Sequence, residues 1–185
     1  MRLFVSVDLD DLAPAVARAQ EPFRDADGLR LVDPDQVHVT LKFLGDTDED
    51  ELPALTDALA AAVADSDVEA FRAEIGGYGV FPSLDYISVV WLGVRAGGDA
   101  MTRLHEAIEA RTVDLGFDPE DHDFTPHATI ARMDHAGSKD LVQRVVAADD
   151  PDVGTLSVSE IRLTESILSD EGPEYRTVES FPLAD

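Results

Sequence analysis

Apolar residues recur at every second position in several short runs of the chain, a spacing typical of strands whose side chains alternate between the two faces of a sheet. The first run reaches an acid, Asp8, within one strand length. Strands are expected at residues 2–9, 29–32, 37–44, 68–75, 87–94, 127–131, 155–168 (one long strand or two short ones) and 175–181. The GGYG segment at 76–79 predicts a loop or a bulge after the fourth run.

Apolar residues at helical spacing predict four helices between these strands. The helices are expected at residues 11–23, 49–64, 99–115 and 139–148. Asp10 or Asp11 can cap the first helix, and Gly116 closes the third. Because strands and helices mix and strands are often consecutive, the order favours an α+β fold over a doubly wound parallel sheet.

Each half of the chain carries the series strand, helix, strand, helix, strand, which predicts two lobes related by an internal duplication. No linker rich in Pro, Gly or Ser separates the halves. We therefore expect one domain over residues 1–185, in which two pseudo-symmetric lobes pack as a unit.

One four-residue pattern, a histidine followed by any residue, a threonine and an aliphatic residue, occurs in both halves. The copies are His38-Val39-Thr40-Leu41 and, 89 residues later (127 − 38), His127-Ala128-Thr129-Ile130. Two such matches among five histidines arise by chance on the order of once in 10³ sequences at average residue usage. In a strand, residues i and i+2 point the same way, so each histidine shares a face with its threonine.

Two imidazoles and two hydroxyls that face one groove suit acid–base chemistry on a phosphate. Because histidine has an unperturbed pKa of about 6.5, His38 and His127 can serve as general base and general acid at neutral pH. Thr40 and Thr129 would donate hydrogen bonds to the non-bridging phosphate oxygens. This chemistry requires no metal and no other cofactor.

The ordinary alternative is a pair of core strands that happen to contain histidine, and the matched motifs weigh against it. A zinc site built on His38 and His127 is a further alternative, with Asp46, His122 or Asp123 as added ligands. Two histidines are too few for such a site, and an acid would be expected where each threonine stands. We therefore expect no metal.

The 185-residue chain is 44% hydrophobic, enough for a sizeable core, and this excludes wholesale disorder. It has no apolar run of 18 residues and no uninterrupted apolar stretch of the kind found in signal peptides. It contains no cysteine, which excludes disulfides and thiolate metal sites. A cytoplasmic monomer without membrane contact is expected.

The formal net charge is −25, from 39 acidic against 14 basic residues. The acids are scattered rather than gathered in a tail, which favours a halophilic source, where a Debye length of about 3 Å at 1 M salt screens their repulsion. An ordinary acidic mesophilic protein is the alternative. Such a charge excludes the binding of long nucleic acid by counterion release, so any RNA must be held at one end by a small local site.

Several segments, taken in order, give the chain a resemblance to a known family. They are RLFV at 2–5, VHVTLKFLG at 37–45, VFP at 80–82, VWLGV at 90–94, FTPHATIAR at 124–132 and FPL at 181–183. The chain resembles the RNA 2′,3′-cyclic phosphodiesterases, also called 2′-5′ RNA ligases, within the two-histidine phosphoesterase superfamily. The resemblance covers nearly the whole chain, and the first motif with its Leu-Lys-Phe-Leu-Gly extension is fairly specific.

The resemblance implies a bilobal α+β fold with a central cleft, and metal-independent hydrolysis of a 2′,3′-cyclic phosphate to a 2′-phosphate. It implies that His127 activates water as the base and that His38 protonates the 3′ oxygen as the acid, although pseudo-symmetry leaves the reverse assignment open. The substrates would be RNA ends or tRNA halves, and reversible 2′-5′ joining of RNA is the ligase side of the same chemistry. The alternatives are a phosphodiesterase for small cyclic or 2′-5′-linked nucleotides and a non-catalytic module that binds RNA ends.

Two basic residues near the motifs are candidate substrate contacts. Alternation places Lys42 on the face of His38 and Thr40, where it would line the groove. Arg132 resembles a family position and is a candidate phosphate contact. Alternation turns it away from His127 unless the strand ends or carries a bulge.

Other aromatic residues and one further histidine are assigned structural positions. Phe43, Phe81 and Trp91 are expected in the core rather than as platforms for bases. His105 is expected on the surface of its helix.

Overall fold

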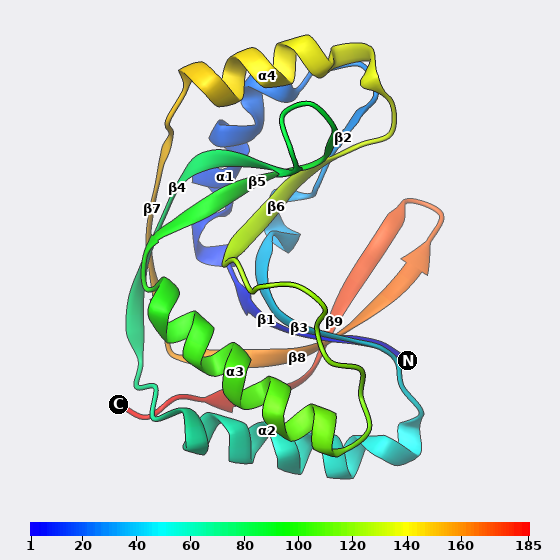
Figure 1. Cartoon of the computed structure of the whole chain (residues 1–185), viewed down its shortest axis with the longest axis vertical. Coiled ribbons are helices and arrows are strands. Elements are labelled where there is room, and N and C mark those ends of the chain that lie inside the picture. Colours follow the sequence, from blue (N-terminus) through cyan, green and yellow to red (C-terminus); the bar gives the residue numbers. More distant parts are fainter.

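The computed structural model describes all 185 residues (Figure 1). The strands are β1 (Arg2–Asp8), β2 (Leu29–Leu31), β3 (His38–Asp46), β4 (Phe71–Pro82), β5 (Ile87–Ala96), β6 (His127–Met133), β7 (Asp152–Val158), β8 (Glu160–Ser169) and β9 (Gly172–Pro182). The helices are α1 (Ala13–Gln20), α2 (Leu52–Ser66), α3 (Gly98–Asp114) and α4 (Lys139–Ala148). Short 3-10 turns are η1 (Asp10–Leu12), η2 (Glu21–Phe23), η3 (Pro34–Gln36), η4 (Glu49–Glu51) and η5 (Ala136–Ser138).

The expected strands and helices are present, but the first helix is shorter than expected: α1 covers only Ala13–Gln20, and its N-cap is Leu12 rather than Asp10 or Asp11. At two segments where the sequence left two possibilities, the structure has one of them. The apolar run at 155–168 is divided between β7 and β8. The GGYG segment lies within β4 and carries a bulge at Gly77, whose φ of +77° is a conformation that glycine adopts without steric cost.

One antiparallel sheet runs through the molecule in the order β7-β4-β5-β6-β3-β1-β8-β9, and β2 pairs with β6 outside this path. Mixed helices and an antiparallel sheet make up the α+β class that the sequence predicts. The two motif strands, β3 and β6, are neighbours in the middle of the sheet.

The boundary between β3 and β6 divides the sheet into two similar quartets. Helices α1 and α4 pack against the quartet β7-β4-β5-β6, and helices α2 and α3 pack mainly against the quartet β3-β1-β8-β9. The two pairs of helices lie at opposite ends of the molecule (Figure 1). Each quartet contributes one motif strand, yet the division does not follow the two halves of the chain, since β1 and β3 lie in one quartet with β8 and β9. The origin of the quartets in a duplication stays a prediction.

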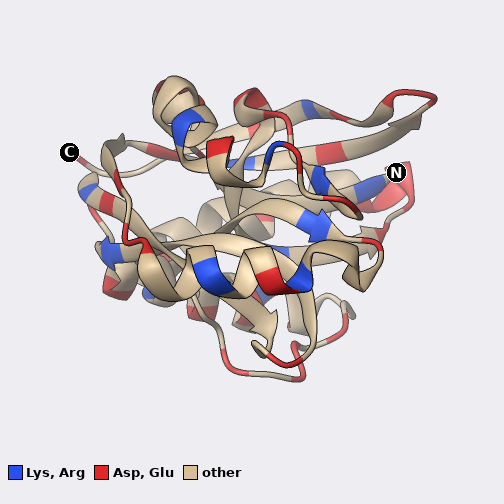
Figure 2. Cartoon of the chain, turned by 90° about the horizontal axis from the view of Figure 1, so that it is seen from above, with Lys and Arg blue, Asp and Glu red and all other residues tan.

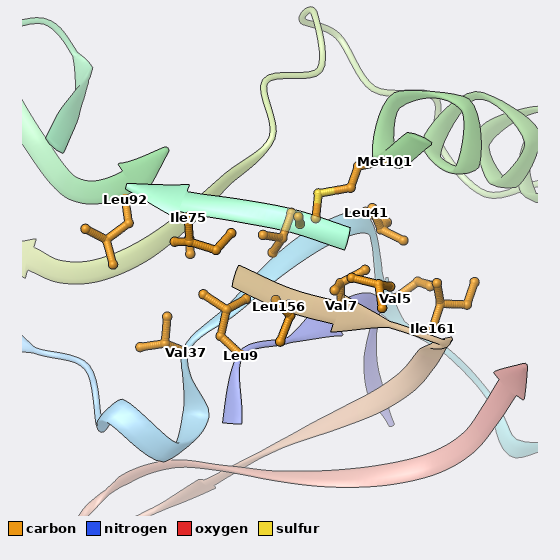
Figure 3. Close-up of a cluster of buried hydrophobic side chains, with 14 of the residues drawn as sticks. Val5, Val7, Leu9, Val37, Leu41, Ile75, Leu92, Met101, Leu156 and Ile161 are labelled. Carbon is orange, nitrogen blue, oxygen red and sulfur yellow. The ribbon is translucent and has the colours of Figure 1, made fainter. Parts of the chain in front are cut away.

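A continuous apolar cluster of 34 buried residues holds the sheet and its helices together. Figure 3 shows part of this cluster, in which side chains from β1, β3, β4, β5, β7, β8 and α3 meet. Burial of each large apolar side chain is worth about 1.5–3 kcal/mol. The cluster therefore fixes the two quartets relative to each other, and with them the two motif strands.

Acidic residues are spread along the helices, loops and strand edges in Figure 2, with basic residues between them. This distribution agrees with the scattered charge of the sequence. None of the helices combines the length and the apolar character needed to cross a bilayer.

Candidate active site

The site lies on the sheet face opposite the core, where β3 meets β6. The two strands pair at Val39 and Ala128, both of which are fully buried on the core face. In an antiparallel pair this register sets each motif histidine beside the other motif's threonine, and side chains directly opposite each other have Cβ atoms about 4.5–5.5 Å apart. Four polar side chains thus share one face and line one cavity: His38, Thr40, His127 and Thr129.

The first motif strand contains a β-bulge one residue beyond its threonine. Consecutive residues of β1 pair with Thr40 and Lys42, so Leu41 has no partner in that ladder. After a bulge the alternation of faces shifts by one residue. Lys42 is therefore turned to the buried side, and Phe43, 64% exposed, is turned to the cavity.

The expectation that Lys42 lies on the groove face is wrong, and the bulge is the physical reason. Although Lys42 counts among the residues around the cavity, only 1% of its surface is exposed. Its ammonium group donates to the carboxylate of Glu109 (Nζ–Oε2 3.1 Å) and to the carbonyl of Asp118 (2.6 Å). A substrate phosphate cannot compete for a cation that is buried and paired in this way.

The second motif strand contains a matching bulge. Consecutive residues of β5 pair with Thr129 and Ala131, so Ile130 is the unpaired residue. The shift brings Arg132 to the face of His127, where it lines the cavity. Arg132 takes part in none of the ion pairs of the structure, so its guanidinium is free to bind an anion.

A buried polar side chain from a helix caps each bulge. His105 on α3 donates from Nδ1 to the Leu41 carbonyl at 2.7 Å, and Gln20 on α1 donates from Nε2 to the Ile130 carbonyl at 3.0 Å. His105 is only 9% exposed and stacks on Phe124. The expectation that His105 lies on the surface is therefore wrong.

Each motif histidine is held in one tautomer by the residue two positions before it. Nδ1 of His38 lies 2.8 Å from the carbonyl oxygen of Gln36, and Nδ1 of His127 lies 2.6 Å from that of Thr125. A carbonyl oxygen only accepts, so Nδ1 carries the hydrogen in both rings. Nε2 is then the nitrogen left to exchange a proton with a substrate.

Aromatic side chains fix the planes of both imidazoles. Phe4 stacks on His38 at a centroid distance of 4.8 Å, and Tyr175 of β9 meets the same ring edge-on at 5.4 Å. Phe81 meets His127 edge-on at 4.9 Å. Tyr175 was not foreseen, because it lies far along the chain from the first motif and nothing near it in the sequence marks it.

The expectation that Phe43, Phe81 and Trp91 lie in the core is wrong, since none of them belongs to the buried cluster. The Phe43 ring is turned to the cavity, and Phe81, which is half-buried like Trp91, also lines it. Trp91 packs against both Phe81 and His127, with centroid distances of 5.0 and 5.7 Å. Gly79 allows this position because a Cβ there would lie 2.2 Å from the indole ring.

The pKa values of both imidazoles are lowered. For His38, burial is the largest cause, and the charges of Arg132 and His127 lower its pKa further, against a raising effect of Asp8. For His127, burial is again the largest cause of the lowered pKa, with Arg132 adding to it. Arg132 therefore acts on both rings, as expected for a cation at the centre of the site.

The cavity in front of these residues measures about 1620 Å³. The arginines and lysines around it are Arg2, Arg24, Arg30, Lys42 and Arg132. Three of them are paired with carboxylates, which leaves Arg2 and Arg132 as the free cations. In a chain of net charge −25, two unpaired cations in one cavity mark a place for an anionic ligand.

Of the residues weighed for a metal site, His122 and Asp123 line the same cavity as the motif histidines, whereas Asp46 does not. Ligand atoms of Glu120, Asp121 and His122 lie within 4.8 Å of one another on a largely exposed loop. Neither His38 nor His127 belongs to this group. Exposed acidic groups of this kind are common without an ion.

Comparison of the sequence with known proteins finds relatives along nearly the whole chain. The sequence profile described as "2′-5′ RNA ligase superfamily" matches residues 9–167. The RNA 2′,3′-cyclic phosphodiesterase of Methanothermobacter thermautotrophicus is 36% identical over 186 residues and 99% of each chain. That of Aeropyrum pernix is 36% identical over 151 residues, covering 81% of this chain and 84% of the other.

Solved structures share the fold. TT0787 of Thermus thermophilus is 31% identical, with a TM-score of 0.81 over 99% of this chain and 98% of that one. E. coli LigT, crystallised with 3′-AMP, is 22% identical, with a TM-score of 0.79 over 100% of this chain and 98% of that one. The fold and the family resemblance predicted from the sequence are confirmed.

Proposed function

Because the chain belongs to the 2′-5′ RNA ligase superfamily, we propose that it hydrolyses the 2′,3′-cyclic phosphate at the end of an RNA to a 2′-phosphate. The observation that carries the proposal is the common face of β3 and β6, where two histidines with free Nε2 atoms and two threonines line one cavity. Support also comes from the names of the relatives, several of which are RNA 2′,3′-cyclic phosphodiesterases.

In the proposed reaction the cyclic phosphate lies between the two imidazoles. His127 takes a proton from water through Nε2 as the water oxygen attacks phosphorus, and the bond from phosphorus to the 3′ oxygen breaks. His38, protonated, gives its Nε2 proton to that oxygen, which leaves a 3′-hydroxyl and a 2′-phosphate. Diagonal cross-strand neighbours lie about 7–8 Å apart, a separation in which two imidazoles can reach opposite sides of one phosphorus.

Charge on the phosphate is balanced by three groups in this proposal. Thr40 and Thr129 donate to the non-bridging oxygens, and the free guanidinium of Arg132 neutralises the charge that builds on them. Every role is filled by a side chain of this protein, so the proposed hydrolysis is independent of metals. Lys42 is left out because its charge is already paired with Glu109.

The same arrangement supports reversible 2′-5′ joining of RNA, for instance of tRNA halves. In that reaction a 5′-hydroxyl replaces water as the nucleophile, loses its proton to His127, and forms a bond to phosphorus as the 3′ oxygen leaves. The acid and the base have the same tasks as in hydrolysis. The name of the superfamily supports this second outcome of the same step.

The direct test is a product assay on a short RNA with a 2′,3′-cyclic end, in molar KCl and with a chelator present. We expect a 2′-phosphate as product and a rate that the chelator does not change. High salt is used because screening is expected to stabilise a chain of net charge −25. A 3′-phosphate product, or a rate abolished by the chelator and restored by a metal, would contradict the proposal.

A further inference from the structure

The β8–β9 hairpin extends the cavity beyond the end of the sheet's central strands. The last pair between β1 and β8 is Arg2 with Ser166. Beyond it, residues 167–169 pair only with residues 172–174, so the hairpin stands free of β1 (Figure 1). Its free end forms a wall of the same cavity that contains the two histidines.

The free end of this hairpin lines the cavity with apolar side chains and with two acids, Glu171 and Glu174. Leu168 lies on the face of Ser166, and its cross-strand partner is Pro173. All three line the cavity, together with Tyr175, which contacts His38. Leu168 is 81% exposed, and with Pro173 it forms an apolar surface at the mouth of the cavity.

The neighbouring strands β1 and β3 add apolar side chains and an unpaired cation to this part of the cavity. Phe43 is 64% exposed there, and the Phe4 ring contacts both Phe43 and Tyr175, at centroid distances of 6.4 and 5.2 Å. Arg2, at the base of the hairpin, has no ion-pair partner. Exposed apolar side chains beside an unpaired cation match a nucleotide, which offers a base to stack and a phosphate to neutralise.

The volume of the cavity independently indicates room for more than one nucleotide. Small-ligand pockets commonly measure about 300–1,000 Å³, whereas this cavity measures about 1620 Å³. A cyclic phosphate occupies the 3′ end of its strand, so the rest of an RNA leaves the histidines in one direction only. The hairpin supplies a continuous wall in one such direction.

We propose that Leu168, Phe43 and Arg2 bind the nucleotide that precedes the cyclic end, so that the preferred substrate is a strand of at least two nucleotides. This inference rests on the proposed function and names its substrate class. The apolar side chains contact the base of the preceding nucleotide, and Arg2 binds the phosphate that links it to the terminal one.

The test compares kcat/KM for a dinucleotide with a 2′,3′-cyclic end against kcat/KM for a 2′,3′-cyclic mononucleotide. The wild type should prefer the dinucleotide by about tenfold or more. Leu168→Ser should lower this ratio by about 5- to 20-fold, as expected for one lost apolar contact. Arg2→Gln should lower it by an amount that shrinks as KCl is raised, because salt screens a phosphate contact.

Ile167→Ser is the matched control, since Ile167 lies on the other face of the same hairpin and is 40% exposed. It should leave the ratio at the wild-type value, and melting temperatures of all variants check that the hairpin is intact. A wild-type ratio near one, or equal effects of the Ile167 and Leu168 variants, would overturn the inference and leave the proposed function standing. Lack of turnover of both substrates by the wild type would instead contradict the proposed function.

Discussion

His38 and His127 are held in place by the same two kinds of contact. A carbonyl two residues earlier holds Nδ1–H of each, and aromatic rings confine each imidazole plane. Preorganisation of this kind removes the cost of orienting the rings when substrate binds. The positive charge of Arg132 contributes to the lowered pKa of both rings, after burial as the largest cause.

Replacement of Arg132 tests this contribution through pH. The kcat/KM profile of the free enzyme needs one imidazole neutral and the other protonated, so it is bell-shaped between two macroscopic pKa values. Burial and the charge of Arg132 lower the pKa of both histidines. The maximum of kcat/KM is therefore expected below about pH 6.5. Arg132→Gln removes a positive charge, raises both pKa values and should move the maximum to higher pH, with a rate loss of about 10- to 100-fold.

Arg132→Lys is the matched control because it retains the charge. Its maximum should stay at the wild-type pH even where the rate falls through loss of the bidentate contact. A profile of the Gln variant that keeps its maximum, or shifts it to lower pH, would show that Arg132 does not set the protonation of the pair.

Among the elements, the motif strands were predictable; the bulge in β3 was not foreseen, and the bulge in β6 was raised only as the condition for Arg132 to reach the site. Period-two alternation correctly placed His38 and Thr40 on one face, because apolar neighbours such as Val39 must be buried. Beyond the threonine of each motif, the same alternation assigned Lys42 and Arg132 to the wrong faces of their strands. Each bulge is stabilised from a distant helix, where His105 or Gln20 caps the displaced carbonyl, and no local pattern records such a contact.

The cap on the second bulge can be tested by stability. Gln20 is 3% exposed and its Nε2 donates to the carbonyls of Ile130 and Val32. Gln20→Met keeps the volume but removes both hydrogen bonds, which should lower the free energy of unfolding by about 1–3 kcal/mol in a urea titration. Gln143→Met is the control: Gln143 makes one exposed hydrogen bond, to Leu84, and its loss should cost less than about 0.5 kcal/mol. Equal losses would contradict a structural role for the cap.

For the molecule as a whole, the net charge of −25 is expected to make stability depend strongly on salt. The core of 34 buried residues must hold the fold against this self-repulsion. Composition alone was enough to foresee this conflict. The make-up of the quartets was harder to foresee, because strand order within a sheet depends on long-range pairings such as β1 with β8.

Salt should therefore stabilise the protein by screening. We expect the melting temperature to rise steeply as KCl is increased and to level off near about 1 M, where the Debye length of about 3 Å is already of atomic size. A continued rise at higher salt would indicate surface exclusion of salt rather than screening. A melting temperature that is independent of KCl would contradict the charge argument.

The central claim is that His38 and His127 act on a single phosphorus, and a double-mutant cycle on RNA with a cyclic end tests it most directly. His38→Ala and His127→Ala should each lower kcat by more than about 10²-fold, with unchanged melting temperature. Because the two groups act in one step, the double variant should lose little beyond the worse single variant, within about tenfold. Full turnover by either single variant, or single losses that multiply to about 10⁴-fold or more in the double variant, would contradict the account.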